Sequence, residues 1–216
     1  MSVLSPKEVA DLYRKRAENY DISASLYYLI GFRFHHYRAL TIDSLDLGKG
    51  DTVVELGCGT GLNFPLLQEK IGNEGKIIGV DITDKMLKKA RERVRKNNWN
   101  NVEFFHGDVA RYNIPDGVDA VFSTFALTLS PDYDMVIRNC SESLKKGGRI
   151  AILDFRMPGG YVRYLAPLMI LLTKPFGVRK ELRHRHPWES VEMYFQKSSL
   201  SEMYWGFVYL SVGIKD

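Results

Sequence analysis

The spacing of apolar residues divides this chain into two parts. In the first part, apolar and aromatic residues recur at helical spacing, which predicts helices within 5–21 and 24–45. In the second part, short apolar runs alternate with amphipathic stretches of helical period. This pattern predicts a series of strands and helices, with strands at 52–57, 76–81, 102–108, 118–127 and 149–155 and helices at 60–72, 83–98 and 133–148.

The alternation of strands and helices predicts the fold class. Strands separated by helices of about ten residues or more form parallel sheets with right-handed crossovers. The C-terminal stretch 199–215 differs, because two extended runs meet at Gly206 with no room for a crossover helix. We therefore expect an α/β fold, a Rossmann-like, doubly wound, seven-stranded sheet whose last strand is an antiparallel edge strand.

The first helix has a start signal in the sequence. Ser5 can cap its amino end, and Pro6 suits the first helical position. Glu8 can complete a capping box with Ser5. We expect this helix to begin at Pro6.

Composition limits the class of protein and its cellular compartment, but it does not identify a ligand. A net charge of +4 over 216 residues is too small to indicate nucleic acid binding by itself. Two cysteines, Cys58 and Cys140, suit a reducing cytoplasm rather than a disulfide framework or a metal cluster. The charged N-terminal segment lacks the apolar core of a signal peptide. The longest apolar run, 164–172, is too short to cross a bilayer.

Three glycines mark the first strand-to-helix turn, in the stretch VVELGCGTG at 53–61. Gly57, Gly59 and Gly61 allow a ligand to lie directly against the backbone. In a doubly wound sheet, ligands bind at the carboxyl ends of the strands, beside this turn. The glycine pattern alone fits a nicotinamide or flavin cofactor equally well, so the neighbouring acids decide between these classes.

Carboxylates accompany three successive strands. Glu55 lies two residues before the glycines, where it would repel a pyrophosphate but attract a sulfonium or ammonium group. Asp81 ends the second strand, where a carboxylate can accept both hydroxyls of a ribose. Asp108 follows the third strand, in a position to accept from an adenine amino group. Together they indicate a positively charged nucleoside rather than a dinucleotide.

These stretches, together with VDIT at 80–83, HGDV at 106–109, FSTFALTL at 122–129 and LKKGGRIAILDF at 144–155, resemble the class I S-adenosylmethionine-dependent methyltransferases. The resemblance implies an enzyme that uses S-adenosylmethionine, releases S-adenosylhomocysteine and needs no metal. It also implies a set of cofactor-binding residues, namely Tyr20, Glu55, Gly57, Cys58, Gly59, Thr60, Gly61, Asp81, Ile82, Asp108, Val109 and Thr124.

On this resemblance we expect one methyltransferase domain over residues 1–216. Its parts would be an N-terminal helical lid (1–48), a cofactor-binding core (49–155), an insert facing the substrate or a membrane (156–197) and a C-terminal hairpin (198–216).

The segment after the fourth strand disfavours two classes of methyl acceptor. It lacks the Asn-Pro-Pro-aromatic motif of enzymes that methylate adenine amino groups, and no Pro-Cys pair supplies the nucleophile of cytosine C5 enzymes. It also lacks the acid that a magnesium-dependent, catechol-type site needs at this strand end. We therefore expect no nucleic acid partner and a small-molecule or lipid acceptor.

The first part of the insert, 156–188, combines an apolar run with many basic residues and a single acid, Glu181. This composition suits either a core helix followed by a solvated basic loop or an element that meets anionic lipid. The second arrangement resembles two bacterial groups, the phospholipid N-methyltransferases and the ubiquinone/menaquinone C-methyltransferases, and the C-terminal tail is more similar to the first group. Our main hypothesis is therefore N-methylation of an amino-lipid headgroup, such as phosphatidylethanolamine, by a cytoplasmic protein in peripheral contact with the inner membrane face.

This hypothesis names residues on the acceptor side. Arg179, Lys180 and Arg183 would hold the lipid phosphate. Proton loss from the acceptor could be assisted by a side chain of the N-terminal helices, for which the candidates are Tyr20, Tyr28, His35 and His36.

Two other functions stay open. One is a quinone-pathway or small-metabolite C- or O-methyltransferase, although the quinone enzymes usually show an FGLRN-like turn where this chain reads FSTFALT at 122–128. The other belongs to a different class, a non-catalytic S-adenosylmethionine-binding module whose basic face binds a partner.

Overall fold

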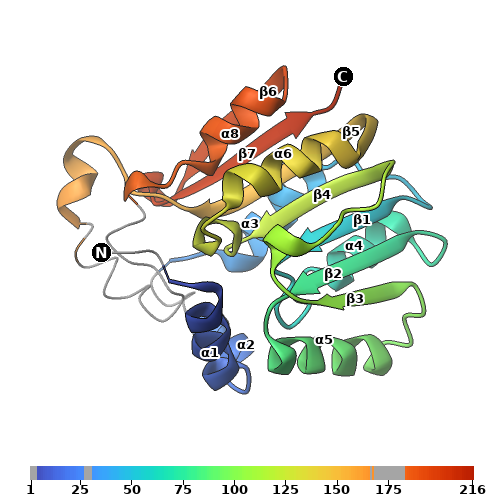
Figure 1. Cartoon of the computed structure of the whole chain (residues 1–216). Coiled ribbons are helices and arrows are strands. Elements are labelled where there is room, and N and C mark those ends of the chain that lie inside the picture. Colours follow the sequence, from blue (N-terminus) through green and yellow to red (C-terminus); the bar gives the residue numbers. More distant parts are fainter. Residues whose placement is uncertain (1–3, 27–30, 166, 168–182) are drawn as a thin grey trace.

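A computed structural model describes residues 4–26, 31–165, 167 and 183–216. Its centre is a seven-stranded sheet with the strand order β3-β2-β1-β4-β5-β7-β6 (Figure 1). All neighbouring strands from β3 to β5 pair in parallel, which confirms the predicted doubly wound, Rossmann-like sheet. The strands are β1 (Thr52–Leu56), β2 (Lys76–Asp81), β3 (Val102–His106), β4 (Val118–Thr124), β5 (Leu144–Phe155), β6 (Lys197–Met203) and β7 (Val208–Ile214).

The last strand is reversed, as the sequence predicts, but it does not lie at the edge. β7 pairs antiparallel with both β5 and β6, so β6 is the edge strand. The composition of the two strands explains this order. The strand KSSLSEM of β6 is exposed along almost its whole length, whereas VYLSVGI of β7 is mostly buried, and a polar strand is better suited to a solvent-facing edge.

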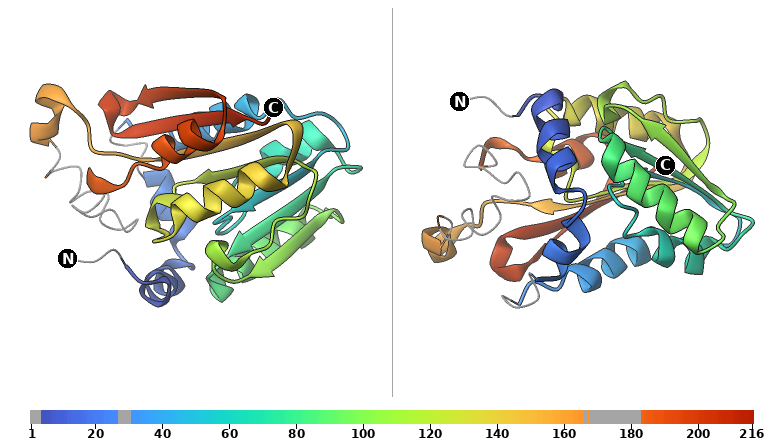
Figure 2. Two further views of the ribbon diagram at one scale, coloured as in Figure 1. Left: turned by 45° about the horizontal axis from the view of Figure 1, so that its top comes forward. Right: turned by 90° about the horizontal axis from the view of Figure 1, so that it is seen from below.

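Helices cover both faces of the sheet, with α3, α4 and α5 on one face and α6 and α8 on the other (Figures 1 and 2). The alternation along each strand supplies the two cores. Val53 and Ile77 join the first core, while their neighbours Val54 and Ile78 join the second. The helices are α1 (Pro6–Arg16), α2 (Tyr20–Leu26), α3 (Phe34–Ser44), α4 (Phe64–Ile71), α5 (Asp84–Lys96), α6 (Tyr133–Ser143) and α8 (Pro187–Tyr194).

The N-terminal segment is more broken than its helical period predicts. The start is confirmed, because Ser5 and Glu8 form the predicted capping box at Pro6. The first helix, however, ends at Arg16 and a separate helix follows from Tyr20. The predicted helix 24–45 is wrong as a single element, since α2 ends at Leu26 and α3 begins at Phe34.

The reason for the second break is visible just before α3. Gly31 has a positive φ of 78°, which a helix interior does not allow. The next residue, Phe32, is buried and contacts the rings of Phe34, Phe125 and Phe155. The chain therefore turns to place an aromatic side chain in the core.

The predicted helix 133–148 is also too long. α6 ends at Ser143 because β5 begins at Leu144, so that Leu144 to Gly148 extend the strand beyond the predicted 149–155. Within this extension, Gly147 has a positive φ of 77°, which a helix would not allow. Lys145 and Lys146, which the prediction placed at the end of the helix, lie instead on an exposed part of this strand.

α1 and α2 lie beside the carboxyl ends of the parallel strands, where they meet α5 (Figures 1 and 2). Three ion pairs of the described residues join this N-terminal segment to α5, of which two are Arg14 with Asp84 at 2.8 Å and Glu18 with Lys89 at 2.6 Å. Both are solvent-exposed pairs, each of which stabilises a fold only weakly. Among the described helices, none is long and apolar enough to cross a membrane.

Candidate functional site

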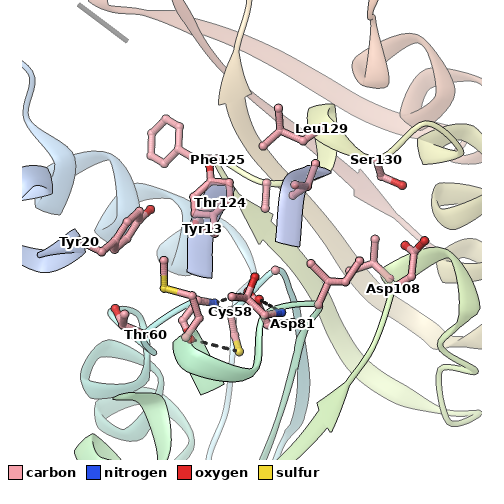
Figure 3. A pocket seen from close by; sticks show the side chains of 18 of the residues that line it. Tyr13, Tyr20, Cys58, Thr60, Asp81, Asp108, Thr124, Phe125, Leu129 and Ser130 are labelled. Atoms are coloured by element: carbon pink, nitrogen blue, oxygen red, sulfur yellow. Dashed lines mark hydrogen bonds between the residues drawn. The ribbon is translucent and has the colours of Figure 1, made fainter. Parts of the chain in front are cut away.

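A cleft opens at the carboxyl ends of the parallel strands, beneath α1 and α2 (Figure 3). It encloses about 810 Å³ of space, part of it open to solvent. Strand-end loops form its floor, and the N-terminal helices form its roof. The lining residues are Pro6, Val9, Tyr13, Tyr20, Arg38, Gly57, Cys58, Gly59, Thr60, Leu62, Asp81, Ile82, Thr83, Met86, Asp108, Val109, Thr124, Phe125, Ala126, Leu129, Ser130 and Pro131.

Asp81 is fixed at the centre of this floor. One carboxylate oxygen accepts from the Gly59 amide at 2.8 Å, and the other accepts from the Thr83 amide at 2.8 Å. Burial raises the pKa of Asp81, while the Thr83 and Gly59 amides act in the opposite direction. Asp81 lines the cleft, and a carboxylate oxygen that has accepted one hydrogen bond can accept another.

The three glycines of the loop serve different purposes. A Cβ on Gly57 would lie 2.3 Å from Cβ of Ala126, and one on Gly61 would lie 2.6 Å from the Phe64 ring. These two glycines therefore allow close packing within the protein. A Cβ on Gly59 would meet no protein atom within 4 Å, which shows that Gly59 opens the loop toward the cleft.

Gly59→Ala tests whether that open space holds a ligand. Gly59 has φ +54°, a left-handed conformation that costs alanine roughly 1–2 kcal/mol. We expect a loss of about that size in the free energy of unfolding by urea denaturation. We also expect affinity for S-adenosylmethionine, measured by calorimetry, to fall about tenfold or more because the methyl group projects into the cleft. Unchanged affinity would contradict a ligand at this position.

A buried hydrogen-bond chain lies behind the loop. The Asn63 amide donates to a Glu55 oxygen at 2.6 Å and to the Thr124 hydroxyl oxygen at 3.0 Å, and Arg38 donates to the same Thr124 oxygen at 2.7 Å. Burial raises the pKa of Glu55 to about 8, although Asn63 and Arg38 favour its charged form. Glu55 thus influences the cleft through Asn63 and Thr124, and it does not line the cleft itself.

Arg38 is the cation of the cleft. Its side chain is buried, lines the cleft and lies over the rings of Phe34 and Phe125, 5.6 and 5.8 Å from their centroids. No carboxylate of the described residues forms a salt bridge with it, and its Nε has no hydrogen-bond partner there. A buried, unpaired guanidinium is costly, so this group is well suited to an anionic ligand atom.

Tyr13 and Tyr20 bring two aromatic rings to the cleft from α1 and α2, with their centroids 6.1 Å apart. Burial raises the pKa of both hydroxyls. Each tyrosine therefore stays protonated near neutral pH and can donate a hydrogen bond, but it is a poor general base.

Cys58 lies in the glycine loop with its side chain buried. Its thiol is directed toward the Gly59 carbonyl, with a sulfur–oxygen distance of 3.9 Å. Burial raises the pKa of this thiol well above its ordinary value, and the charges of Asp81 and Glu55 add to that shift. The group is accordingly a neutral thiol.

Two buried charges hold the turn after β4 that forms one cleft wall. Asp154, at the end of β5, accepts from the Thr128 amide at 2.9 Å. Arg185 donates to the Ser130 carbonyl and lies over the Tyr133 ring. Burial raises the pKa of Asp154 to about 6, while the hydrogen bonds from Thr128 and the charge of Arg185 lower it.

Most of the sequence-predicted residues meet in this cleft. The ones that line it are Tyr20, Gly57, Cys58, Gly59, Thr60, Asp81, Ile82, Asp108, Val109 and Thr124. Glu55 lies behind the loop, and Gly61, within the loop, packs against the Phe64 ring instead of lining the cleft. Tyr28, Arg179 and Lys180 fall outside the described residues.

Three predicted acceptor-side residues lie away from the cleft. His36 is exposed because the buried face of α3 carries Phe34, Tyr37 and Arg38, and residue 36 falls on the opposite side. His35 is exposed on the same side of α3. Arg183 is exposed too, and its Nε donates to a ring nitrogen of His184 at 2.8 Å.

Several lining residues are absent from the sequence-based prediction, Tyr13 and Arg38 foremost. For Arg38 a signal exists, since it follows Phe34 by four residues and thus shares the apolar face of its helix. Val9, Phe125, Leu129 and Ser130 carry no comparable signal, because apolar and small residues of this kind occur throughout the core.

Comparison with known proteins adds the family. A family model described as a methyltransferase domain matches residues 47–194. A demethylmenaquinone methyltransferase from Listeria welshimeri is 30% identical over 223 aligned positions, which cover 97% of this chain and 92% of that protein.

Solved structures with the same fold are more distant in sequence. A SAM-dependent methyltransferase from Aquifex aeolicus has a TM-score of 0.55 at 21% identity, over 79% of this chain and 85% of that one. A phosphoethanolamine N-methyltransferase from Haemonchus contortus, bound to S-adenosylhomocysteine, has a TM-score of 0.62 at 16% identity, over 78% of this chain and 49% of that one. At these identities the likeness concerns the fold.

Proposed function

Since the chain belongs to the methyltransferase-domain family and uses S-adenosylmethionine, we propose that it methylates a ring carbon of a quinol of the demethylmenaquinone type. The observation that carries this proposal is the match to a demethylmenaquinone methyltransferase along nearly the full length of both chains. The match supports the quinone alternative over an amino-lipid headgroup.

The amino-lipid hypothesis has less support. It depends on basic residues of the insert, of which Arg179 and Lys180 lie outside the described residues and Arg183 does not line the cleft. The phosphoethanolamine enzyme is related in fold only. The quinol therefore becomes the leading acceptor, and phosphatidylethanolamine becomes the competitor in the test.

The cleft suits the cofactor in shape and in charge. Gly59 leaves open space above the loop, and Asp81 offers two fixed oxygens to the hydroxyls of a ribose. One oxygen of Asp108 accepts from the Ala110 amide. The carboxylate would also accept from the adenine amino group. Arg38 would pair with the methionine carboxylate, which would provide the partner that its buried charge lacks.

The cofactor supplies a methyl group on a positively charged sulfur: the methyl–sulfur bond would break as the new carbon–carbon bond forms, S-adenosylhomocysteine would leave, and the proton of the ring carbon would pass to solvent. The contribution of the protein is to align the acceptor carbon with that methyl group and to exclude water. Val9, Phe125 and Leu129 give the cleft an apolar wall that fits a flat ring. Tyr13 and Tyr20 present aromatic faces that stabilise a nearby cation, and their protonated hydroxyls can hold a quinol oxygen.

A competition assay tests this proposal. The purified protein is incubated with methyl-labelled S-adenosylmethionine, chemically reduced demethylmenaquinone in detergent micelles, and an equal amount of phosphatidylethanolamine. We expect mass spectrometry to find one added methyl group on the quinone and none on the lipid. Label in the lipid alone would overturn the proposal in favour of the headgroup hypothesis, and cofactor binding without label in either would favour a non-catalytic module.

A further inference from the structure

Asp21, at the start of α2, forms a ring of hydrogen bonds with two other residues, Thr60 and Arg93, at the edge of the cleft. One of its oxygens accepts from the Thr60 hydroxyl at 2.6 Å, and the other accepts from Arg93 at 2.6 Å. Arg93 in turn donates through Nε to the Thr60 carbonyl at 3.0 Å. The ring joins three separate elements, namely the N-terminal lid, the glycine loop and α5.

The ring differs from the other contacts between the lid and α5. The pairs Arg14–Asp84 and Glu18–Lys89 connect lid and helix only, and none of their four residues lines the cleft. The Asp21 ring includes Thr60, a buried residue that lines the cleft. It also fixes the first turn of α2, where the neighbouring Tyr20 reaches into the same cleft.

The geometry requires both oxygens of Asp21. Each oxygen receives its own donor, and charge-assisted bonds of this length are stronger than neutral ones. An asparagine keeps one acceptor oxygen and puts an NH2 donor in place of the other, so the bond to Arg93 loses its charge and the Thr60 hydroxyl can no longer donate to the second position. Loss of the charge should therefore release the lid from the loop while leaving the sheet and its cores unchanged.

We propose that Asp21 is a positioning residue of the cofactor site, which couples closure of the N-terminal lid to the conformation of the glycine loop. The inference rests on the assignment of that loop to the cofactor, but not on the identity of the methyl acceptor. α1 covers the cleft with Val9 and Tyr13, so displacement of this roof would speed release of the cofactor. Asp21 thus sets how long the cofactor stays bound.

Cofactor dissociation is the measurement that tests this role. Stopped-flow displacement gives the rate constant for release of S-adenosylhomocysteine, and calorimetry gives its Kd. For Asp21→Asn we expect release to be about tenfold faster and Kd to rise by a similar factor, which corresponds to about 1.4 kcal/mol. Glu18→Gln is the matched control, because it removes a lid–α5 ion pair that touches no cleft residue, and we expect a change of less than about twofold.

A second variant separates positioning from general stability. Thr60→Val removes the hydroxyl but keeps the shape of the side chain, and we expect it to weaken binding by a similar factor. If the two residues act through their mutual bond, the double variant Asp21→Asn/Thr60→Val should be no weaker than either single variant. Additive losses in the double variant, or equal small effects of Asp21→Asn and Glu18→Gln, would overturn the proposal. Should Asp21→Asn fail to fold, Thr60→Val alone must speed release, or the coupling is absent.

Because every readout concerns the cofactor, this result stands apart from the quinol assay. Absence of quinol methylation with faster release in Asp21→Asn would reject the proposed acceptor and support the role of Asp21. Quinol methylation by the wild type, with unchanged release of S-adenosylhomocysteine from Asp21→Asn, would support the proposed acceptor and reject the role of Asp21.

Discussion

Asp81→Asn is expected to weaken S-adenosylmethionine binding about a hundredfold or more. The carboxylate would accept two ribose hydroxyls, and hydrogen bonds to a charged group contribute roughly 1.5–3 kcal/mol each. The amide of asparagine would also bring a donor against the Gly59 or Thr83 amide, since each oxygen of Asp81 accepts from one of them. Calorimetric titration of both proteins with S-adenosylmethionine measures the difference.

The control for Asp81 is another aspartate of the sheet. Asp119 accepts from the Thr52 amide at 2.7 Å, at the amino end of β1 and so at the opposite end from the cleft. We expect Asp119→Asn to affect the free energy of unfolding but not cofactor affinity. If Asp81→Asn binds as tightly as the wild type, Asp81 does not hold the ribose.

Glu55→Gln is expected to change how stability depends on pH. In the folded protein the pKa of Glu55 is raised to about 8 from an ordinary value of 4.5, so the native state holds a proton that the unfolded state releases. The resulting stability is fully present below about pH 4.5 and is lost as pH rises through about 8. At about 1.4 kcal/mol per pH unit between the two values, the loss amounts to roughly 3–5 kcal/mol.

Glutamine cannot ionise but can still accept from Asn63. Urea denaturation of the cofactor-free proteins should therefore show that Glu55→Gln loses less stability than the wild type between pH 5 and 9, by about the amount given above. Asp154, whose pKa is raised to about 6, contributes equally to both proteins and cancels in the difference. Glu74→Gln, a change at an exposed loop position, should follow the wild type. Parallel curves for Glu55→Gln would show that this carboxyl is ionised in the folded state.

The strand-end residues of the cleft could be predicted because β1, β2 and β3, which follow one another in the chain, are also neighbours in the sheet. Parallel strands bring their carboxyl ends to one edge, so Asp81, Asp108 and the glycine loop meet once the alternation of strands and helices is recognised. The reversed β7 was predictable as well, since the short connection at Gly206 allows only a hairpin.

The roof of the cleft could not be predicted in the same way. Tyr13 and Arg38 reach the site only because α1 packs against α5 and α3 packs against β5, elements that lie far from them in sequence. Helical period predicts which residues share a face, but it does not indicate which part of the sheet that face covers. The break near Gly31 also depends on tertiary packing, because Phe32 is buried among rings from the ends of β4 and β5.

The burial of the Cys58 thiol affects how easily S-adenosylmethionine could alkylate the protein. A sulfonium cofactor is an alkylating agent, and a thiolate is far more nucleophilic than a thiol. Cys58 lines the cleft that would hold this reagent, yet burial and the nearby carboxylates keep its sulfur protonated. Burial of the thiol would therefore protect the loop from alkylation by a bound sulfonium cofactor.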